Sequence, residues 1–415
     1  MFTLLFIAFL LTDVLLRFWL ASRQLRHVIR HRDKVPPEFS ERIGLYSHQR
    51  AADYTVAKIR FSMLEHITEA AVLIGFTLLG GLQFIDLHLG KLIANEMWRQ
   101  LALIAAVLAI MGVIGLPFSV WRKFKLEARF GFNRVTPRLF IVDSLKTLLL
   151  VLLFGTPLAA GVLWIMGNTG TSWVIWAWAT WVVFNVLILW LFPTLIAPMF
   201  NKFTPLDNPE MTQRIHSLAQ RCGFSLDSLM VMDGSRRSAH GNAYFTGFGK
   251  SRRIVFFDTL LARLNADEIE AVLAHELAHF KHKHILKRMA INFVLALVFF
   301  MLLGWLSNQV WFYVELGVLP QLGRPNDALA LVLFFMVIPV FTFWVSPLFS
   351  WLSRRDEYQA DRYAATQSSA PALVSALIKL YDDNAATLTP DPLHSAFYDS
   401  HPPAILRIQR LINND

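Results

Sequence analysis

Seven long apolar runs limit this chain to folds that lie in a membrane. Each run is long enough to cross a hydrocarbon layer of about 30 Å as a helix. The composition agrees, because 55% of the 415 residues are hydrophobic, only 17% are charged and the mean hydropathy is +0.45. We therefore expect a mainly α-helical integral membrane protein with about seven transmembrane helices. The runs lie near residues 1 to 20, 67 to 86, 98 to 120, 146 to 167, 172 to 199, 289 to 312 and 327 to 351.

The loops between these runs differ in their content of Lys and Arg. Residues 21 to 61 and the segment after the third run are rich in both, whereas residues 168 to 171 have neither and residues 308 to 326 have only Arg324. Basic loops stay in the cytoplasm, so we expect the N-terminus outside and the C-terminus on the cytoplasmic side. The net charge of +9 then belongs to residues beside the bilayer, and we expect no nucleic-acid partner.

Two polar segments, residues 201 to 286 and 353 to 415, are long enough to form structure outside the membrane. The first mixes helical periodicity with short apolar runs separated by glycines, which predicts a helix, a small sheet and a second helix capped by Asn265. The expected elements are a helix over 208 to 221, strands over 229 to 232, 243 to 246 and 253 to 257, and a helix over 267 to 284.

The second of these helices contains the sequence His275-Glu276-Leu-Ala-His279. Residues four apart on a helix lie one above the other, so both imidazoles can bind one ion while Glu276 lies beside it as a base. This is zinc-protease spacing, and it makes a metallopeptidase the first hypothesis. The competing interpretation is an amphipathic helix with surface histidines. Because Cys222 is the only cysteine, any zinc has to be held by histidines and carboxylates.

A catalytic zinc usually has three protein ligands and one open position. A third histidine further along the helix does not fit, because position 285 is Ile285. His282 would need a distorted helix, and we expect His282 and His284 to form a basic helix end at the membrane surface. Better candidates are Glu357 and Asp361, four apart after the last apolar run, the first as a ligand and the second as a hydrogen-bond acceptor for a ligand histidine. A charged helix start held by ion pairs is an equally good interpretation of this segment.

Longer stretches around these residues resemble one family. From about residue 40 to the end, the chain resembles the type I CAAX prenyl endopeptidases, integral-membrane zinc proteases that process prenylated proteins. The resemblance implies that Glu357 is the third ligand of one zinc ion and that seven spans enclose a water-filled chamber. The stretches include Arg129-Phe-Gly-Phe-Asn-Arg-Val-Thr-Pro, Asp233-Gly-Ser-Arg-Arg-Ser-Ala-His-Gly-Asn-Ala-Tyr-Phe-Thr-Gly, Glu357-Tyr-Gln-Ala-Asp and His401-Pro-Pro.

The resemblance also implies two further groups of site residues. His401 and Arg407 match residues that would hydrogen-bond the substrate carbonyl and the oxyanion. Asn242, Ala243 and Tyr244 match a substrate-binding edge strand. Without the resemblance, the second group is a plain edge strand, and His401 lies in a turn before a helix that begins with two prolines.

We therefore expect a zinc-dependent endopeptidase in which Glu276 takes a proton from water and passes it to the leaving amine. Asp361 is expected to orient His275, and a role as proton donor stays open. The substrate is a peptide or protein, and the sequence leaves its identity and its prenylation open. Rival functions are a broad-scope membrane quality-control zinc protease, a transporter or channel without zinc, and a zinc-binding scaffold without turnover.

The absence of an Asn-x-Ser/Thr sequon and of a retrieval signal favours a bacterial inner membrane.

We expect the protein to be a monomer and its chain to be organised in four parts. The parts are five N-terminal membrane helices in 1–200, a small zincin-like α+β metalloprotease core in 201–286, two further membrane helices in 287–352 and a cytoplasmic segment completing the zinc site in 353–415.

Overall fold

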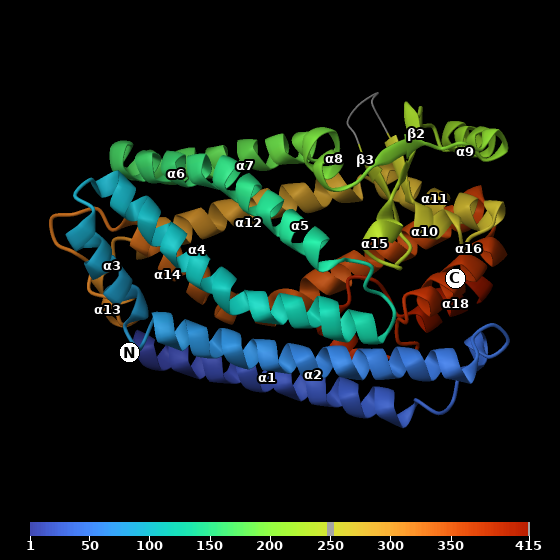
Figure 1. Cartoon of the computed structure of the whole chain (residues 1–415), viewed down its shortest axis with the longest axis horizontal. Coiled ribbons are helices and arrows are strands. Elements are labelled where there is room, and N and C mark those ends of the chain that lie inside the picture. Colours follow the sequence, from blue (N-terminus) through green and yellow to red (C-terminus); the bar gives the residue numbers. More distant parts are fainter. Residues whose placement is uncertain (247–252, 414–415) are drawn as a thin grey trace.

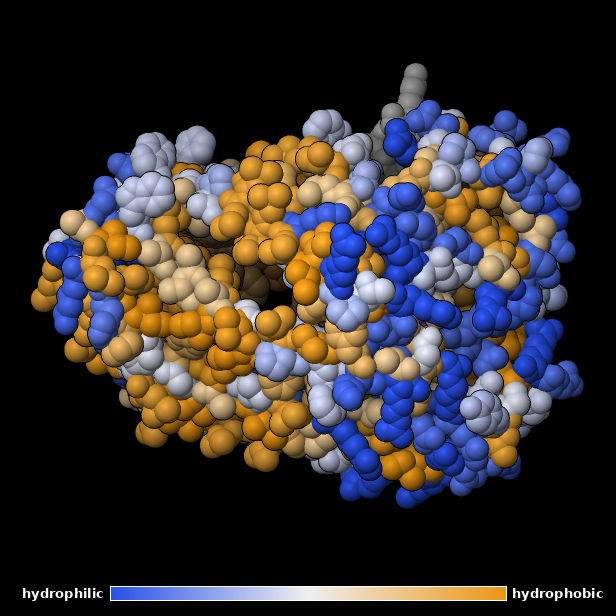
Figure 2. Space-filling model, in the orientation of Figure 1, coloured by the Kyte–Doolittle hydropathy of each residue, from blue (hydrophilic) through white to orange (hydrophobic). Residues whose placement is uncertain are grey.

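The chain forms one part made of long apolar helices and another that carries a small sheet. The computed structural model describes residues 1–246 and 253–413. In Figure 1 the long helices fill the left and centre, and the sheet and shorter helices gather at the right. Figure 2 shows the same division on the surface, which is mainly hydrophobic at the left and mainly hydrophilic at the right. A protein that is partly embedded in a bilayer has to separate its surface in this way.

Among the described residues, six helices are long and apolar enough to cross a membrane, and a bent pair makes a seventh span if its helices count as one. The expectation of about seven transmembrane helices is therefore confirmed. The elements of the six are α1 (Phe2–Arg30), α4 (Glu96–Trp121) with η2 (Arg122–Glu127), α5 (Pro137–Leu150) with η3 (Val151–Gly155) and α6 (Thr156–Asn168), η4 (Gly170–Ser172) with α7 (Trp173–Leu191), η5 (Phe192–Ile196) and α8 (Ala197–Phe200), α12 (His284–Leu306), and α14 (Asp327–Thr342) with η7 (Phe343–Val345) and α15 (Ser346–Gln367).

The bent pair consists of α2 (Leu45–Phe76) and α3 (Gly81–Leu92), which meet at 51°. Gly80 has a φ of 74°, in the left-handed region that favours glycine. A Cβ on Gly81 would lie 2.6 Å from the carbonyl oxygen of Gly75. The two consecutive glycines therefore permit a turn that other residues would strain.

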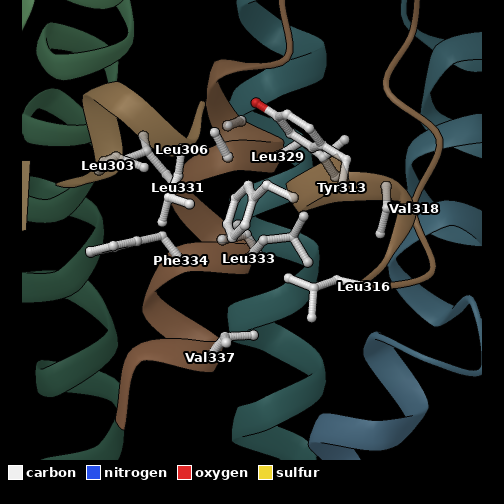
Figure 3. Close-up of a cluster of buried hydrophobic side chains, with 14 of the residues drawn as sticks. Leu303, Leu306, Tyr313, Leu316, Val318, Leu329, Leu331, Leu333, Phe334 and Val337 are labelled. Carbon is white, nitrogen blue, oxygen red and sulfur yellow. The ribbon is translucent and has the colours of Figure 1, made fainter. Parts of the chain in front are cut away.

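Helix α14 belongs to the most enclosed of the six single spans. Of its most apolar stretch, 56% is buried, against 28% or less for the other five single spans. Figure 3 shows its leucines and Phe334 packed against α12 and against the connection that follows α13 (Val310–Val314). Because α14 continues into α15, this packing also fixes the helix that leaves the apolar part. Labelled members of the cluster are Leu303, Leu306, Tyr313, Leu316, Val318, Leu329, Leu331, Leu333, Phe334 and Val337.

The long helices enclose a cavity of about 640 Å³. Its lining comes from α1, α2, α4, α6, α7, α12 and α14 and is mostly apolar. Its charged side chains are paired, since Arg17 Nε lies 2.9 Å from Asp13 Oδ2 and His66 Nδ1 lies 3.1 Å from Glu69 Oε2. A chamber enclosed by membrane helices, as the family resemblance implies, is thus present.

The sheet lies between the fourth and fifth of the six single spans and has the order β1-β2-β4-β3. Strands β2 and β4 are parallel, and β1 and β3 pair antiparallel at the two edges. The expected strands are confirmed, whereas β1, which contains a proline, was not expected. The remaining elements are η1 (Pro37–Phe39), β1 (Phe203–Pro205), α9 (Pro209–Arg221), β2 (Ser228–Met232), η6 (Gly234–Arg236), β3 (Ala243–Thr246), β4 (Arg253–Phe257), α10 (Asp258–Leu261), α11 (Ala266–Lys281), α16 (Ala370–Asp383), α17 (Pro392–Tyr398) and α18 (Ala404–Asn413).

Helix α11 lies in the core of the sheet-containing part, where it packs against α15, α16 and α9. It begins with a capping box, in which Asn265 accepts from the backbone N–H of Glu268 and Glu268 accepts from that of Asn265. It ends at Lys281, and the next helix starts after Lys283, whose φ is 57°. This left-handed residue turns the chain sharply back towards the end of α11.

Candidate metal centre

Three side chains from two helices converge on one point. His275 and His279 extend from α11, and their Nε2 atoms lie 3.4 Å apart. Glu357 extends from α15, with Oε2 3.3 Å from His275 Nε2 and Oε1 3.5 Å from His279 Nε2. One potential ligand atom from each residue lies within 4.8 Å of the other two. The three residues form the only such group found among the described residues.

The chemistry of this group fits a metal ion. Glu357 is buried, and its Oε2 has no hydrogen-bond partner in the described structure. A buried carboxylate oxygen is costly unless a donor or a cation balances it. Two imidazole nitrogens and one carboxylate are also the donor set of catalytic zinc sites that keep one position open. The residues present therefore suit zinc.

The two histidines differ in their affinity for a proton. Burial lowers the pKa of His275, but the carboxylates of Asp361 and Glu357 outweigh it and raise that pKa to about 9. Burial, together with the positive charge of His275, lowers the pKa of His279 to about 4. A cation entering the site therefore has to displace any proton that His275 holds at Nε2.

Behind His275 lies a chain of two buried charged groups. Asp361 Oδ1 lies 2.9 Å from His275 Nδ1. Arg407 from α18 donates to both oxygens of Asp361, from Nε at 2.8 Å and from Nη2 at 2.5 Å. The 2.9 Å distance is an ion-pair contact whose angle lies outside hydrogen-bond geometry, and it places Asp361 beside the nitrogen opposite Nε2, which faces the metal point. The guanidinium of Arg407 thus forms its hydrogen bonds with Asp361. The expected contact of Arg407 with the substrate stays a prediction.

Behind His279 lies a residue that the sequence analysis misplaced. His284 Nδ1 lies 3.0 Å from His279 Nδ1, and His284 Nε2 lies 3.0 Å from Gln359 Oε1 on α15. His284 is 1% exposed, so the expectation that it belongs to a basic surface end is wrong. The reason is the left-handed turn at Lys283, which brings His284 over the end of α11 although His284 comes five positions after His279. Gln359 also contacts His282, with its Nε2 3.0 Å from His282 Nδ1.

Two further candidates, Glu276 and His401, flank the three ligands. Glu276 has no hydrogen bond or ion pair within the described residues, and burial raises the pKa of its carboxyl group. His401 Nε2 lies 3.5 Å from Glu357 Oε2, and its Nδ1 lies 3.1 Å from the Ser400 hydroxyl. Both side chains are thus placed where they could act on a bound peptide.

The expected substrate-binding residues separate onto different surfaces. Asn242 lines a cavity of about 780 Å³ together with His401. Tyr244 lines another cavity, of about 300 Å³, with Pro198, and Ala243 packs against the core. Alternation along β3 puts Ala243 and Tyr244 on opposite faces, and Asn242 lies just before the strand, outside its regular alternation. The backbone of β3 nevertheless lies at an edge of the sheet and is open to a further strand.

A helix that carries His275, Glu276 and His279 and meets Glu357 on the continuation of a membrane span is the arrangement expected of an integral-membrane metalloprotease. Family models agree with this class. Residues 24–202 match the CAAX prenyl protease N-terminal domain with its five membrane helices, and residues 205–414 match peptidase family M48. The chain belongs to the M48 family, and the expectation of a membrane metallopeptidase is confirmed.

Individual relatives cover most of the chain. CAAX prenyl protease 1 of Saccharomyces cerevisiae is 33% identical over 91% of this chain and 88% of that protein. A CAAX prenyl protease 1 homolog of Arabidopsis thaliana is 35% identical over 77% of this chain and 75% of that protein. The crystal structure of S. mikatae Ste24p superposes with a TM-score of 0.90 at 32% identity and covers 99% of this chain and 98% of that chain.

Proposed function

We propose that this protein is a zinc-dependent endopeptidase of the CAAX prenyl protease type. The observation that carries the proposal is the convergence of His275, His279 and Glu357 within 4.8 Å, with Glu276 on the same helix. The three side chains would hold one zinc ion. When bound, zinc supplies a Lewis acid that polarises a peptide carbonyl and lowers the pKa of a water molecule.

The remaining chemistry belongs to side chains of the chain itself. The carboxylate of Glu276 takes a proton from water and delivers it to the leaving amine. Its raised pKa, caused by burial, helps it to hold that proton between the two transfers. His401 donates to the oxygen on which negative charge develops. Its distance of 3.5 Å from Glu357 Oε2 supports a place beside the reacting carbonyl.

Asp361 and Arg407 are proposed to act mainly through His275. The 2.9 Å approach of Asp361 to His275 Nδ1 supports a role in fixing the tautomer, and the two hydrogen bonds from Arg407 support a role in holding Asp361. A direct contact of Arg407 with the substrate oxyanion is the second, less favoured assignment.

The substrate is proposed to bind as an additional strand. The edge position of β3 supports this, because a peptide that pairs with β3 gains backbone hydrogen bonds largely independent of its side chains. The cavity beside Asn242 and His401 would receive the rest of the peptide. The names of the relatives support a substrate whose carboxyl end is prenylated, and comparison of prenylated and unprenylated peptides would test this against a broad quality-control protease.

We further propose that the catalytic part faces the cytoplasm and that the parts of the chain are bounded as expected above, at residues 200, 286 and 352. The distribution of Lys and Arg supports the orientation. The relatives named above are eukaryotic, so location in a bacterial inner membrane stays a prediction from sequence signals alone.

The first test is the variant Glu276→Gln. It removes the base without touching a zinc ligand, so purified variant and wild type should contain equal zinc, about one ion per chain. The variant should lose peptide cleavage by on the order of 10²–10⁴-fold. Metal analysis and a fluorogenic peptide assay measure the two properties. Cleavage at the wild-type rate by Glu276→Gln would refute the assignment of the base.

A further inference from the structure

His401 lies in a short segment between α17 and α18, and its own side chain does little to fix its position. That side chain is 61% exposed. Its polar contacts among the described residues are with the neighbouring Ser400 hydroxyl, at 3.1 Å, and with Glu357 Oε2, at 3.5 Å. An imidazole held in this way can donate to a developing oxyanion only if the backbone that carries it is fixed.

Arg354 of α15 fixes the start of this segment. Its Nη1 donates to the carbonyl oxygen of Ser395 at 3.0 Å and to that of Asp399 at 2.9 Å. Helix α17 ends at Tyr398, so the carbonyl of Asp399 has no partner in a following helical turn. A basic side chain commonly satisfies such a carbonyl at the end of a helix. The bond to Asp399 lies only two residues before His401.

The contacts of Arg354 differ from those of an ordinary surface arginine. Ion pairs are one interpretation of the charged residues at this point of the sequence, but within residues 1–246 and 253–413 Arg354 forms none. Ser350, one turn earlier on the same helix, donates from its hydroxyl to the carbonyl of Phe397 at 3.3 Å. Helix α15 therefore holds the end of α17 from two successive turns.

The same helix also carries a candidate metal ligand. Arg354 lies three residues before Glu357, which is one of the three converging side chains and the acid that His401 contacts. Residues three apart lie on the same side of a helix. Helix α15 thus sets the position of Glu357 directly and that of His401 through two backbone carbonyls. A shift of the end of α17 relative to α15 would change the distance between the two side chains.

We propose that Arg354 is a positioning residue for the reaction, which holds the end of α17 against α15 and thereby keeps the His401 imidazole where it can donate to the oxyanion. The inference rests on the proposed function, because it requires His401 to act on the substrate. In this role Arg354 acts only through His401 and contacts no reacting atom.

The test measures steady-state cleavage of a fluorogenic peptide by the full-length protein in detergent, together with the zinc content of each variant. Arg354→Met should lower kcat by on the order of 10- to 100-fold, because a misplacement of about 1 Å can cost about 100-fold in rate. The KM and the zinc content should stay near the wild-type values, since neither a zinc ligand nor a substrate-binding group is removed.

Two further variants at the start of α15 make the comparison specific. Arg354→Lys should recover part of the lost kcat, because both hydrogen bonds come from one nitrogen and an ammonium group can donate both. The matched control is Arg355→Met. Arg355 is exposed and forms no hydrogen bond or ion pair in the described part of the chain, so this variant should keep the wild-type kcat.

A double variant decides whether Arg354 acts through His401. His401→Ala alone should lower kcat by on the order of 10²–10³-fold, as expected when one oxyanion donor is lost. Adding Arg354→Met should cause no further loss, because the effects of residues that act as a unit are not additive. A further loss as large as that of Arg354→Met alone would overturn the inference and leave the zinc endopeptidase intact.

The other outcomes also separate the inference from the proposed function. A raised KM at unchanged kcat in Arg354→Met, a Lys variant no more active than the Met variant, or full activity of His401→Ala each overturns the inference alone. A wild type that cuts no peptide refutes the proposed function, and the inference falls with it. If Arg354→Met does not fold, which loss of zinc and aggregation would reveal, Arg354→Lys takes its place in the double variant.

Discussion

At the residue scale, the candidate site consists of His275, His279 and Glu357, which converge on one point, and both histidines contact other polar groups on their far sides. Asp361 holds His275, and His284 lies against His279 in the same manner. Groups that fix the orientation of a ligand imidazole commonly affect metal affinity nearly as strongly as ligands do. Asp361 comes from α15 and His284 from the start of α12, and His284 is itself bound to Gln359 of α15.

We predict that His284→Ala lowers zinc affinity by about 10- to 100-fold, because His279 then loses the group that holds its Nδ1 side. Competition with a chromophoric chelator measures the affinity. The matched control is His282→Ala, since His282 contacts the same Gln359 but not His279, and it should change the affinity much less. An equal loss of zinc affinity in both variants would indicate a general effect on the turn between α11 and α12. It would contradict the specific role of His284.

Spacing rules predict part of this arrangement. The i, i+4 relation placed His275 and His279 on one helix face, and Glu357 and Asp361 on another, because this relation holds on any regular helix. It could not identify His284, whose position depends on a single left-handed residue, Lys283. Asn would have been a usual signal for such a conformation, and lysine is not. The link from Arg407 to Asp361 depends on tertiary packing and has no local signal.

At the scale of elements, α11 is tied to its neighbour α16 by one buried acid. Glu268 closes the capping box of α11, accepts from Ser375 at 2.7 Å and lies 2.7 Å from Lys379 Nζ. Burial by itself raises the pKa of Glu268, but Lys379, the backbone N–H of Asn265 and Ser375 together lower it below the ordinary value. The start of the metal-binding helix is therefore secured by an ionised group.

We predict that Glu268→Gln destabilises the protein by about 1–3 kcal/mol at neutral pH, because it removes the charge that Lys379 and the cap require. Since the pKa of Glu268 is lower in the folded protein, its stabilisation is present above the unfolded pKa of about 4.3 and is lost as pH falls through the folded value. The apparent Tm in detergent should thus differ between wild type and variant at pH 7 and converge in acid. A difference in Tm between wild type and variant that does not change with pH would contradict an electrostatic origin of the stabilisation by Glu268.

The elements themselves were largely predictable, because helical periodicity and short apolar runs are local properties. The helix at α9 and the strands β2, β3 and β4 agree with expectation within a residue or so. Strand β1 was missed since Phe203-Thr-Pro205 is short and its proline cannot donate to a sheet, which is tolerated only at an edge. The break between α2 and α3 was also missed, although Gly80-Gly81 was its signal.

At the scale of the whole molecule, apolar runs predicted the membrane part well because a bilayer imposes length rules that need no tertiary information. The sequence alone could not show which helices line the cavity of about 640 Å³, or that Lys58 on a membrane helix shares a second cavity with His401. These neighbours are brought together by folding across hundreds of residues.

We predict that the C-terminus lies in the cytoplasm. A fused reporter that fluoresces only in the cytoplasm should be bright, and one that is active only outside should be silent. The same pair of reporters placed after residue 170, in the loop without Lys or Arg, should give the opposite result. If both positions report the same side, the predicted number of membrane crossings is wrong. If each position reports the side opposite to the expected one, the predicted orientation is wrong.

The continuation of α14 into α15 has a consequence during synthesis. With the proposed ligand set, the growing chain already contains His275 and His279 while Glu357 is still to be made and the most enclosed span is still to be inserted. On that ligand set, a truncated or wrongly inserted chain lacks a complete metal site. The order of the elements would therefore delay hydrolysis until the last membrane helix has reached its place.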